Sequence, residues 1–219
     1  MRTPDHLLTG RIVVATHNAG KLEEMRDLLA PYGLELVSAG ALGLPEPEEN
    51  GTMFAENAAI KAHAAAKATG LPAIADDSGL AVDALDGAPG LFTADWAGQP
   101  RDWMRAMSRV KHELETRDVA MEGAQARFVS ALVVAWPDGH TLLAEGRVHG
   151  TLTWPPRGAA GFGYDPVFVP DGETRSFSEL SRAEKHGIRE MDGQLLGLSH
   201  RAKAFICLIE TAGLAKGRA

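Results

Sequence analysis

Short apolar runs alternate with stretches of helical periodicity in the first part of the chain. Residues 11–15 form a β-rich run, and the apolar positions of residues 22–29 recur at helical spacing with charged side chains between them. Gly33 marks the end of this helix, and residues 34–37 are typical of a second strand. This part of the chain is therefore predicted to form a strand, a polar loop, a helix and another strand.

A long helix is predicted next, after a loop at residues 39–51 that is rich in Gly, Pro and Glu. Small side chains recur along one face of this helix and suit close packing. Thr52 is its expected N-cap, and Gly70 and Pro72 end it. The acidic residues of the loop are either a solvated surface or, if the loop folds toward the carboxylates described next, part of a metal site.

The most unusual pattern is an apolar run, residues 71–75, that ends in Asp76 and Asp77 and continues with Ser78 and Gly79. A buried strand ending here would place both carboxylates at the rim of a sheet, where α/β folds bind ligands. Adjacent carboxylates repel unless a cation neutralises them, and their hard oxygens suit Mg²⁺ or Mn²⁺. The alternative is a simple turn or helix cap, because Asp, Ser and Gly all favour turns.

The second half of the chain is predicted to contain a β-hairpin, with one helix before it and two helices after it in the sequence. In chain order these are a helix at residues 101–117, strands at residues 126–136 and 141–149 joined by a turn at residues 137–139, a short helix at residues 177–185 capped by Ser176 or Ser178, and a final helix opened by Ser199. Leu180 is expected to face inward, and residues 186–198 form an irregular segment before the final helix.

Two places are candidates for binding an anion. Thr16, Asn18 and Lys21 lie in a polar loop at a predicted helix N-terminus, where unpaired N–H groups and the helix dipole favour negative charge. The spacing is not that of a P-loop, and an ordinary capped helix with a solvated lysine is the alternative. Lys61 shares a helix face with Asn57 and is either solvated or directed at a phosphate.

A glycine-rich loop at residues 156–168 is a candidate for binding a planar base. Its glycines permit close backbone approach, Phe162 can stack on a base, and Asp165 can accept hydrogen bonds from ring N–H groups. A mobile hairpin is the alternative. His200 and Arg201 open the final helix against the preference of the helix dipole, which a bound anion or an electron-rich carbonyl would explain.

Composition narrows the class of protein. A chain of 219 residues can bury one large core or two lobes, and its net charge of −7 argues against sequence-independent DNA binding. A local basic pocket for one polyphosphate remains compatible with that charge. The lone Cys207 allows no intramolecular disulfide and fits a reducing compartment. The N-terminus lacks a long apolar segment, so a cytoplasmic protein with no membrane contact is expected.

Three separated segments resemble one family when they are taken together. They are Thr16-x-Asn18-x-x-Lys21, then Glu56-Asn57-Ala58 through Lys61 with Ala75-Asp76-Asp77-Ser78-Gly79-Leu80, and finally Gly161-Phe162-Gly163-Tyr164-Asp165-Pro166 with Ser199-His200-Arg201. In this order they resemble the inosine/xanthosine triphosphate pyrophosphatases, the Ham1-like family, over residues 12–212.

The resemblance implies a fold and an activity. The expected fold is a two-lobed α/β structure around a long central mixed β-sheet flanked by helices, with the active-site cleft between the lobes. It implies one domain at residues 11–212 with flexible termini at residues 1–10 and 213–219. The implied activity is Mg²⁺-dependent hydrolysis of ITP, dITP and XTP to the monophosphate and pyrophosphate, with Mn²⁺ as a substitute, by a cytoplasmic homodimer that binds no nucleic acid polymer.

The resemblance also implies roles for individual residues. The triphosphate would be held by Thr16, Asn18, Lys21 and Lys61, and Ser78 would touch the substrate. The metal would be bound by Asp76, Asp77 and Glu48, with Glu49 as the alternative to Glu48. Asp76 and Asp77 would be catalytic, Asp77 as the general base.

The base would be bound by a second group of residues. Its wall would be formed by Phe162, Gly163, Tyr164 and Asp165, and Lys185 would reach the nucleotide. The 6-keto group would be read by His200 and Arg201.

Two departures from the family pattern leave roles open. Most relatives carry Ser-Ala-Arg where this chain has Thr93-Ala94-Asp95, so an anion replaces a cation. Residues 186–198 form a longer connection than usual between Lys185 and Ser199, which is a candidate lid or dimer contact.

Two other activities compete with this reading. One is a Maf-like nucleotide pyrophosphatase with a different base preference. The other is a nucleotide sensor without turnover, against which the complete set of carboxylates and lysines argues.

Overall fold

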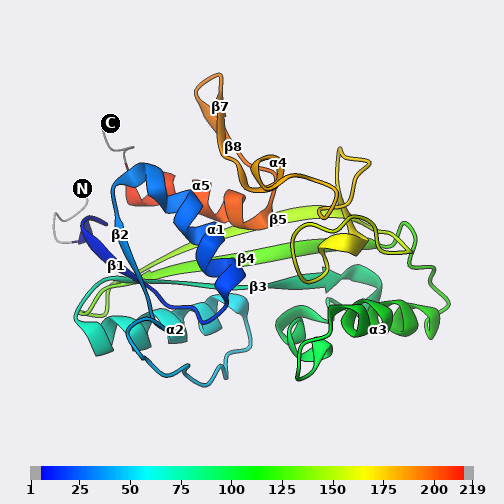
Figure 1. Cartoon of the computed structure of the whole chain (residues 1–219), viewed down its shortest axis with the longest axis horizontal. Coiled ribbons are helices and arrows are strands. Elements are labelled where there is room, and N and C mark those ends of the chain that lie inside the picture. Colours follow the sequence, from blue (N-terminus) through cyan, green and yellow to red (C-terminus); the bar gives the residue numbers. More distant parts are fainter. Residues whose placement is uncertain (1–5, 215–219) are drawn as a thin grey trace.

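A six-stranded mixed sheet forms the centre of the computed structural model, which describes residues 6–214 (Figure 1). Its order is β2-β1-β3-β4-β5-β6. The strands are β1 (Arg11–Val14), β2 (Glu35–Ser38), β3 (Ala73–Val82), β4 (Gln125–Ala135), β5 (Thr141–Leu152) and β6 (Phe168–Pro170). β1 is parallel to β2 and β3, whereas the remaining neighbours are antiparallel. The predicted α/β class with a long mixed sheet is confirmed.

Five α-helices surround this sheet within the described residues. They are α1 (Ala19–Leu29), α2 (Phe54–Thr69), α3 (Trp103–Glu115), α4 (Arg182–His186) and α5 (His200–Ala212). Single 3-10 turns occupy η2 (Ala30–Tyr32), η3 (Asp83–Leu85), η4 (Gly90–Phe92), η5 (Asp95–Ala97) and η6 (Asp165–Val167). In Figure 1, α1 and α5 cover one face of the sheet and α2 covers the other.

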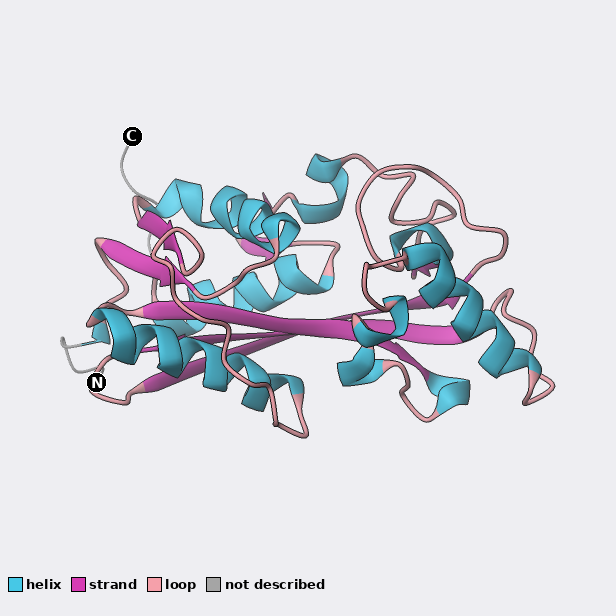
Figure 2. Ribbon diagram, turned by 60° about the horizontal axis from the view of Figure 1, so that its bottom comes forward, coloured by secondary structure: helices cyan, strands magenta, loops and turns pink. Residues whose placement is uncertain are grey.

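Three apolar clusters divide the molecule into two lobes that share the long strands. In the first lobe, α1 and α5 pack on one sheet face through Met25 and Phe205, while the alanines of α2 pack on the opposite face against Val13 and Val133. In the second lobe, α3 packs against the far halves of β3, β4 and β5. Figure 2 shows these long strands crossing from one lobe to the other.

The predicted end of the third strand is wrong. β3 continues through Asp76 and Asp77 to Val82, and it pairs with β4 along its whole length. The turn alternative fails for the same reason. A continuous ladder with a neighbouring strand stabilises this backbone, so the two carboxylates lie in the middle of a strand and not at its rim.

Two predicted helix starts also need correction. Met53, not Thr52, is the N-cap of α2, because Thr52 donates its amide and hydroxyl to Glu56 instead. The short helix predicted at residues 177–185 begins only at Arg182, where Ser181 forms a capping box with Glu184. Neither Ser176 nor Ser178 caps it, although Leu180 is buried as predicted.

The segment at residues 186–198 contains a small second sheet. β7 (Arg189–Met191) and β8 (Gln194–Leu196) form an antiparallel hairpin, which projects from the body of the molecule in Figure 1. Flexible termini are predicted at residues 1–10 and 213–219. Of these, residues 1–5 and 215–219 lie outside the described residues. Leu8, within the described part, is buried in the first lobe.

Candidate active site

A cleft of about 1010 Å³ lies beside β3 where the two lobes meet. Its position follows from the sheet. β1 pairs with β3 only as far as Ile74, and the next backbone partner on that edge is Pro89, which bridges Ala81. Among residues 6–214, no strand pairs with the edge between these points. The edge from Asp76 to Gly79 therefore faces the cleft.

Adjacent side chains on a strand point to opposite faces, and this separates the two carboxylates. Asp76 faces α1 and α5, where it meets Lys21 and Arg201. Asp77 faces α2, where it meets Lys61. Each carboxylate thus has its own cationic partner, and the free strand edge lies between the two pairs.

Asp76 is saturated with hydrogen bonds. Its Oδ1 accepts from Ser130 at 2.5 Å, and its Oδ2 lies 3.0 Å from Ser78 Oγ, 2.9 Å from Lys21 Nζ and 3.1 Å from Arg201 Nη2. Burial opposes ionisation, but the charges of Arg201 and Lys21 outweigh it and hold the pKa of Asp76 well below its ordinary value. In this structure both carboxylate oxygens of Asp76 are therefore bound to donors of the protein.

Asp77 has fewer partners and a different electrostatic setting. Its Oδ1 accepts from Lys61 Nζ at 3.0 Å, and Lys61 also lies 3.2 Å from Glu49 Oε1. Burial raises the pKa of Asp77 above its ordinary value and the charge of Glu49 adds to this, although Lys61 and Lys21 oppose it. Asp77 is therefore the more suitable proton acceptor of the pair.

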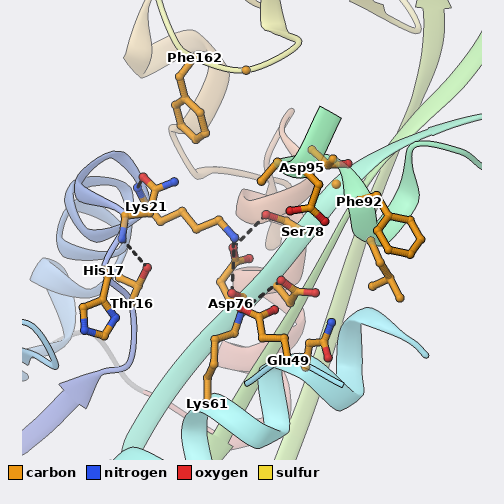
Figure 3. Close-up of a pocket in the computed structure, with 18 of the residues that line it drawn as sticks. Thr16, His17, Lys21, Glu49, Lys61, Asp76, Ser78, Phe92, Asp95 and Phe162 are labelled. Carbon is orange, nitrogen blue, oxygen red and sulfur yellow. Dashed lines mark hydrogen bonds and ion pairs between the residues drawn. The ribbon is translucent and has the colours of Figure 1, made fainter. Parts of the chain in front are cut away.

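The acidic loop brings two glutamates to the cleft. Glu48 and Glu49 both line it, and Glu49 is the one that pairs with Lys61 (Figure 3). This contact connects Glu49, the alternative to the expected metal ligand Glu48, to the Asp77–Lys61 pair.

The anion loop is built differently from the prediction. Asn18 is the N-cap of α1, and its side chain accepts from the amides of Gly20 and Lys21, while Thr16 accepts from the amide of Asn18. These amides are already satisfied within the protein. Thr16 and Asn18 shape the loop, and the Lys21 side chain extends from it into the cleft (Figure 3).

Asp165 organises the glycine-rich loop. Its Oδ2 accepts from the Phe162 amide at 3.0 Å and from Lys185 Nζ at 2.5 Å. A Cβ on Gly161, whose φ is +77°, would lie 2.2 Å from the same oxygen, so only glycine fits. In Figure 3, Phe162 lies across the cleft from Lys61.

The other members of the predicted base wall are buried and line the cleft. Tyr164 packs edge-on against Trp103, and Gly163 precedes it in the loop. Lys185 is buried and also lies 5.0 Å from the ring of Phe177. The Asp165–Lys185 pair therefore holds the loop from behind.

His200 and Arg201 are neighbours in the sequence, but their side chains contact different groups. His200 is buried and stacked on Phe128, and its Nδ1 has no hydrogen-bond partner within the described part of the chain. Burial, and then the charges of Arg201 and Lys185, keep its pKa well below the ordinary value, so the imidazole is neutral.

Arg201 is the centre of a buried ion network. It is 2 % exposed, pairs with Glu24 through Nη1, and donates through Nη2 to Asp76 and to Ser78 Oγ, the latter at 3.1 Å. Its terminal nitrogens therefore hold Glu24, Asp76 and Ser78 together.

Sequence reasoning missed several residues of this network. Glu24 and His186 form a buried pair at 3.2 Å, and Ser130 reaches Asp76 from β4. Glu24 lies four residues before Leu28 on the buried face of α1, and this position was the available signal. Nothing comparable marked His186 or Ser130, because their contacts are long-range.

The two departures from the family pattern are also placed. Asp95 lines the cleft beside Phe92 (Figure 3). The hairpin β7–β8 does not displace Lys185, which precedes it and still reaches Asp165.

Within the described residues, no three His, Cys, Asp or Glu side chains converge as a ready-made metal site. In the same part of the chain, no helix is long and apolar enough to cross a membrane.

The cleft beside β3 has paired lysines and carboxylates on one side and an aromatic loop on the other. This arrangement defines an α/β protein whose site suits a polyanion that carries a planar group. The chain belongs to the Ham1 family, whose model matches residues 12–211. The predicted resemblance is confirmed.

Similar proteins match between 80% and 94% of this chain. A dITP/XTP pyrophosphatase of Rhodopseudomonas palustris is 61% identical over 93% of this chain and 96% of its own. The structure of a HAM1 protein from Coxiella burnetii has a TM-score of 0.82 at 35% identity, covering 94% of this chain and all of that one. A nucleoside-triphosphatase, dITP/XTP pyrophosphatase, from Mycobacterium abscessus has a TM-score of 0.66 at 43% identity and covers 80% of this chain and 91% of its own.

Proposed function

We propose that this protein hydrolyses ITP, dITP and XTP to the nucleoside monophosphate and pyrophosphate, and so removes deaminated purines from the nucleotide pool. The observation that carries the proposal is the placement of Asp77. It lies at a free strand edge beside Lys61 and Lys21, across a cleft from Phe162, so one nucleotide can reach all of them. The names of the relatives support the same substrates.

The triphosphate is placed between the two lysines. Lys21 and Lys61 approach the strand edge from α1 and α2, and both are bound to carboxylates in the protein. A triphosphate competes for these ammonium groups, and they neutralise charge that develops on the phosphate oxygens. Ser78, on the edge between the lysines, is positioned to touch the substrate.

Asp77 orients and deprotonates the attacking water. The attack falls on the α-phosphorus, so the bond to the bridging oxygen breaks and pyrophosphate leaves. The raised pKa of Asp77 makes the carboxylate more basic than an exposed aspartate, which suits a proton acceptor.

A divalent cation, Mg²⁺ or in its place Mn²⁺, belongs to this proposal. Asp77 and Glu49 face one another across Lys61, and Mg²⁺ sites commonly combine one or two carboxylates with substrate phosphates. The donor set therefore fits a cation that arrives with the nucleotide, held by Asp77 and by Glu49 or Glu48. Such a cation supplies charge neutralisation at the phosphates.

The base is placed between the glycine-rich loop and α5. Phe162 supplies a ring for stacking, and His200, which lines the cleft, supplies a neutral imidazole. An N–H of this imidazole donates to the O6 of hypoxanthine or xanthine, whereas the amino group of adenine would leave it unpaired. Arg201 holds Asp76 and Ser78 from behind, and Phe128 stacks on His200.

A substrate panel tests the function. Pyrophosphate release with Mg²⁺ is measured for ITP, dITP, XTP, GTP, ATP and dTTP. We expect ITP to exceed ATP in kcat/KM by about 10²-fold or more, because a buried donor is left unpaired by adenine. His200→Ala should reduce this ratio about tenfold through loss of that hydrogen bond.

His140→Ala is the matched control, since His140 is exposed at the β4–β5 turn. An unchanged ITP-to-ATP ratio in His200→Ala would remove His200 from base selection. Comparable rates on dTTP would favour the Maf-like alternative, and binding without turnover would favour the sensor.

The same proposal includes a single functional domain at residues 11–212, a homodimer and a cytoplasmic location. The two lobes share β3, β4 and β5, which supports one domain.

A further inference from the structure

The segment that carries η4 docks on the free edge of β3 immediately after Ser78. The hydroxyl of Thr93 accepts a hydrogen bond from the Leu80 amide at 3.0 Å and donates to the Gly90 carbonyl at 2.6 Å. One hydroxyl thus closes its own turn and ends the open part of the strand edge.

Gly79 permits this docking. A Cβ at Gly79 would lie 2.5 Å from both the Gly90 carbonyl oxygen and Thr93 Oγ1, and 3.0 Å from the ring of Phe54. Because the backbone around Gly79 is held from this side and paired with β4 on the other, Ser78 and Asp77 have little freedom to shift.

Thr93 is also connected to the glycine-rich loop. The Tyr164 hydroxyl donates to the backbone carbonyl of Thr93 at 3.2 Å, and Tyr164 is 1 % exposed. Tyr164 is two residues from Phe162, on the opposite side of the cleft from Asp77. Thr93 therefore lies between the element that holds the base and the element that holds the reacting phosphate.

We infer that Thr93 is a positioning residue that sets the distance between the glycine-rich loop and the Asp77–Ser78 edge. The inference rests on the proposed function. A nucleotide that binds both elements brings its α-phosphorus to Asp77 only if the two are held in register, and small displacements of reacting groups reduce turnover strongly. Losing this register lowers kcat more than it weakens binding, because the phosphate and base contacts themselves remain.

Thr93→Val and Thr93→Ser form the test pair. Valine keeps the shape but removes the hydroxyl, and we expect kcat for ITP to fall about tenfold with KM changed less than about threefold. Serine keeps the hydroxyl and should restore kcat to within about twofold of the wild type. Thr116→Val, at an exposed threonine that follows α3, controls for the substitution itself.

Tyr164→Phe probes the contact between Thr93 and the glycine-rich loop and leaves the contact between Thr93 and β3 in place. It removes the hydrogen bond to the Thr93 carbonyl, so kcat should fall in the same direction. Combined with Thr93→Val, the two effects should be less than additive, because both variants loosen one connection. Additive effects, or a Thr93→Ser variant as slow as Thr93→Val, would overturn the inference.

Amide hydrogen exchange separates this inference from the proposed function, since it needs no turnover. Thr93→Val should speed exchange at Leu80 and in residues 161–165, and Thr93→Ser should not. If the two variants show this pattern but the wild type releases no pyrophosphate, the proposed function fails, while the connection that Thr93 makes between β3 and the glycine-rich loop stands. Unchanged exchange in residues 161–165 contradicts the role of Thr93.

Discussion

Asp77→Asn is expected to reduce kcat for ITP by about 10²–10⁴-fold, the usual contribution of a general base. Asparagine fills the same space but accepts no proton at neutral pH. Binding of ITP should persist, because the substitution removes a negative charge that faces a polyanion and leaves Glu49 as the one carboxylate paired with Lys61. Single-turnover kinetics gives the chemical step, and calorimetry with ITP gives the affinity.

Asp76→Asn is the matched comparison for this prediction. Asp76 neighbours Asp77 but is bound by Lys21, Arg201 and two hydroxyls, so its loss should appear mainly as lower stability. If Asp77→Asn retains wild-type turnover, Asp77 is not the base. If Asp76→Asn instead loses turnover at unchanged stability, the roles of the two residues are reversed.

Arg201→Met is expected to lower the free energy of unfolding by about 3–5 kcal/mol, because it leaves two buried carboxylates without their shared cation. Glu24 and Asp76 are 6% and 3% exposed, so water does not replace the lost charge. Urea unfolding at neutral pH measures the change. Arg182→Met is the control, since Arg182 pairs with Glu23 and Asp27 at the surface. Its loss should cost at most about 1 kcal/mol.

The pH dependence of stability gives a second readout for Arg201. Burial opposes ionisation of Glu24, but Arg201 and then His186 lower its pKa from 4.5 to about 2. The unfolded chain therefore binds more protons than the folded one between about pH 4.5 and pH 2, and stability falls as the pH drops through this range. In Arg201→Met the pKa of Glu24 returns toward its ordinary value and this contribution shrinks. Equal stability of Arg201→Met and wild type would contradict the network.

Local patterns predicted most elements of the fold. The apolar spacing of residues 22–29 and 101–117 corresponds to α1 and α3, and Gly70 ends α2 in a left-handed conformation as expected. These features depend on neighbours in the sequence, which is why they can be read from it.

The strand through Asp76 and Asp77 could not be predicted in this way. Two adjacent carboxylates followed by Ser and Gly satisfy the local preferences of a turn. The strand persists because β4 pairs with it and because Arg201, distant in the sequence, neutralises Asp76. Tertiary contacts override the local preference at the place where the chemistry is proposed.

The candidate site shows the same division. The sequence motifs brought Lys21, Lys61 and Asp77 into one site, and the structure places all three at the cleft. It also shows which of the polar side chains are bound to one another, which a motif cannot do. Arg201 and Asp165 belong to recognisable motifs, yet their polar atoms are bound to other side chains.

We expect this cleft to direct water to the α-phosphorus of a non-canonical purine nucleotide. Hydrolysis of ITP with Mg²⁺ in water enriched in oxygen-18, followed by mass spectrometry of both products, tests it most directly. The predicted result is IMP that carries the label together with unlabelled pyrophosphate. Label in pyrophosphate, release of IDP and phosphate, or no hydrolysis of ITP would contradict it.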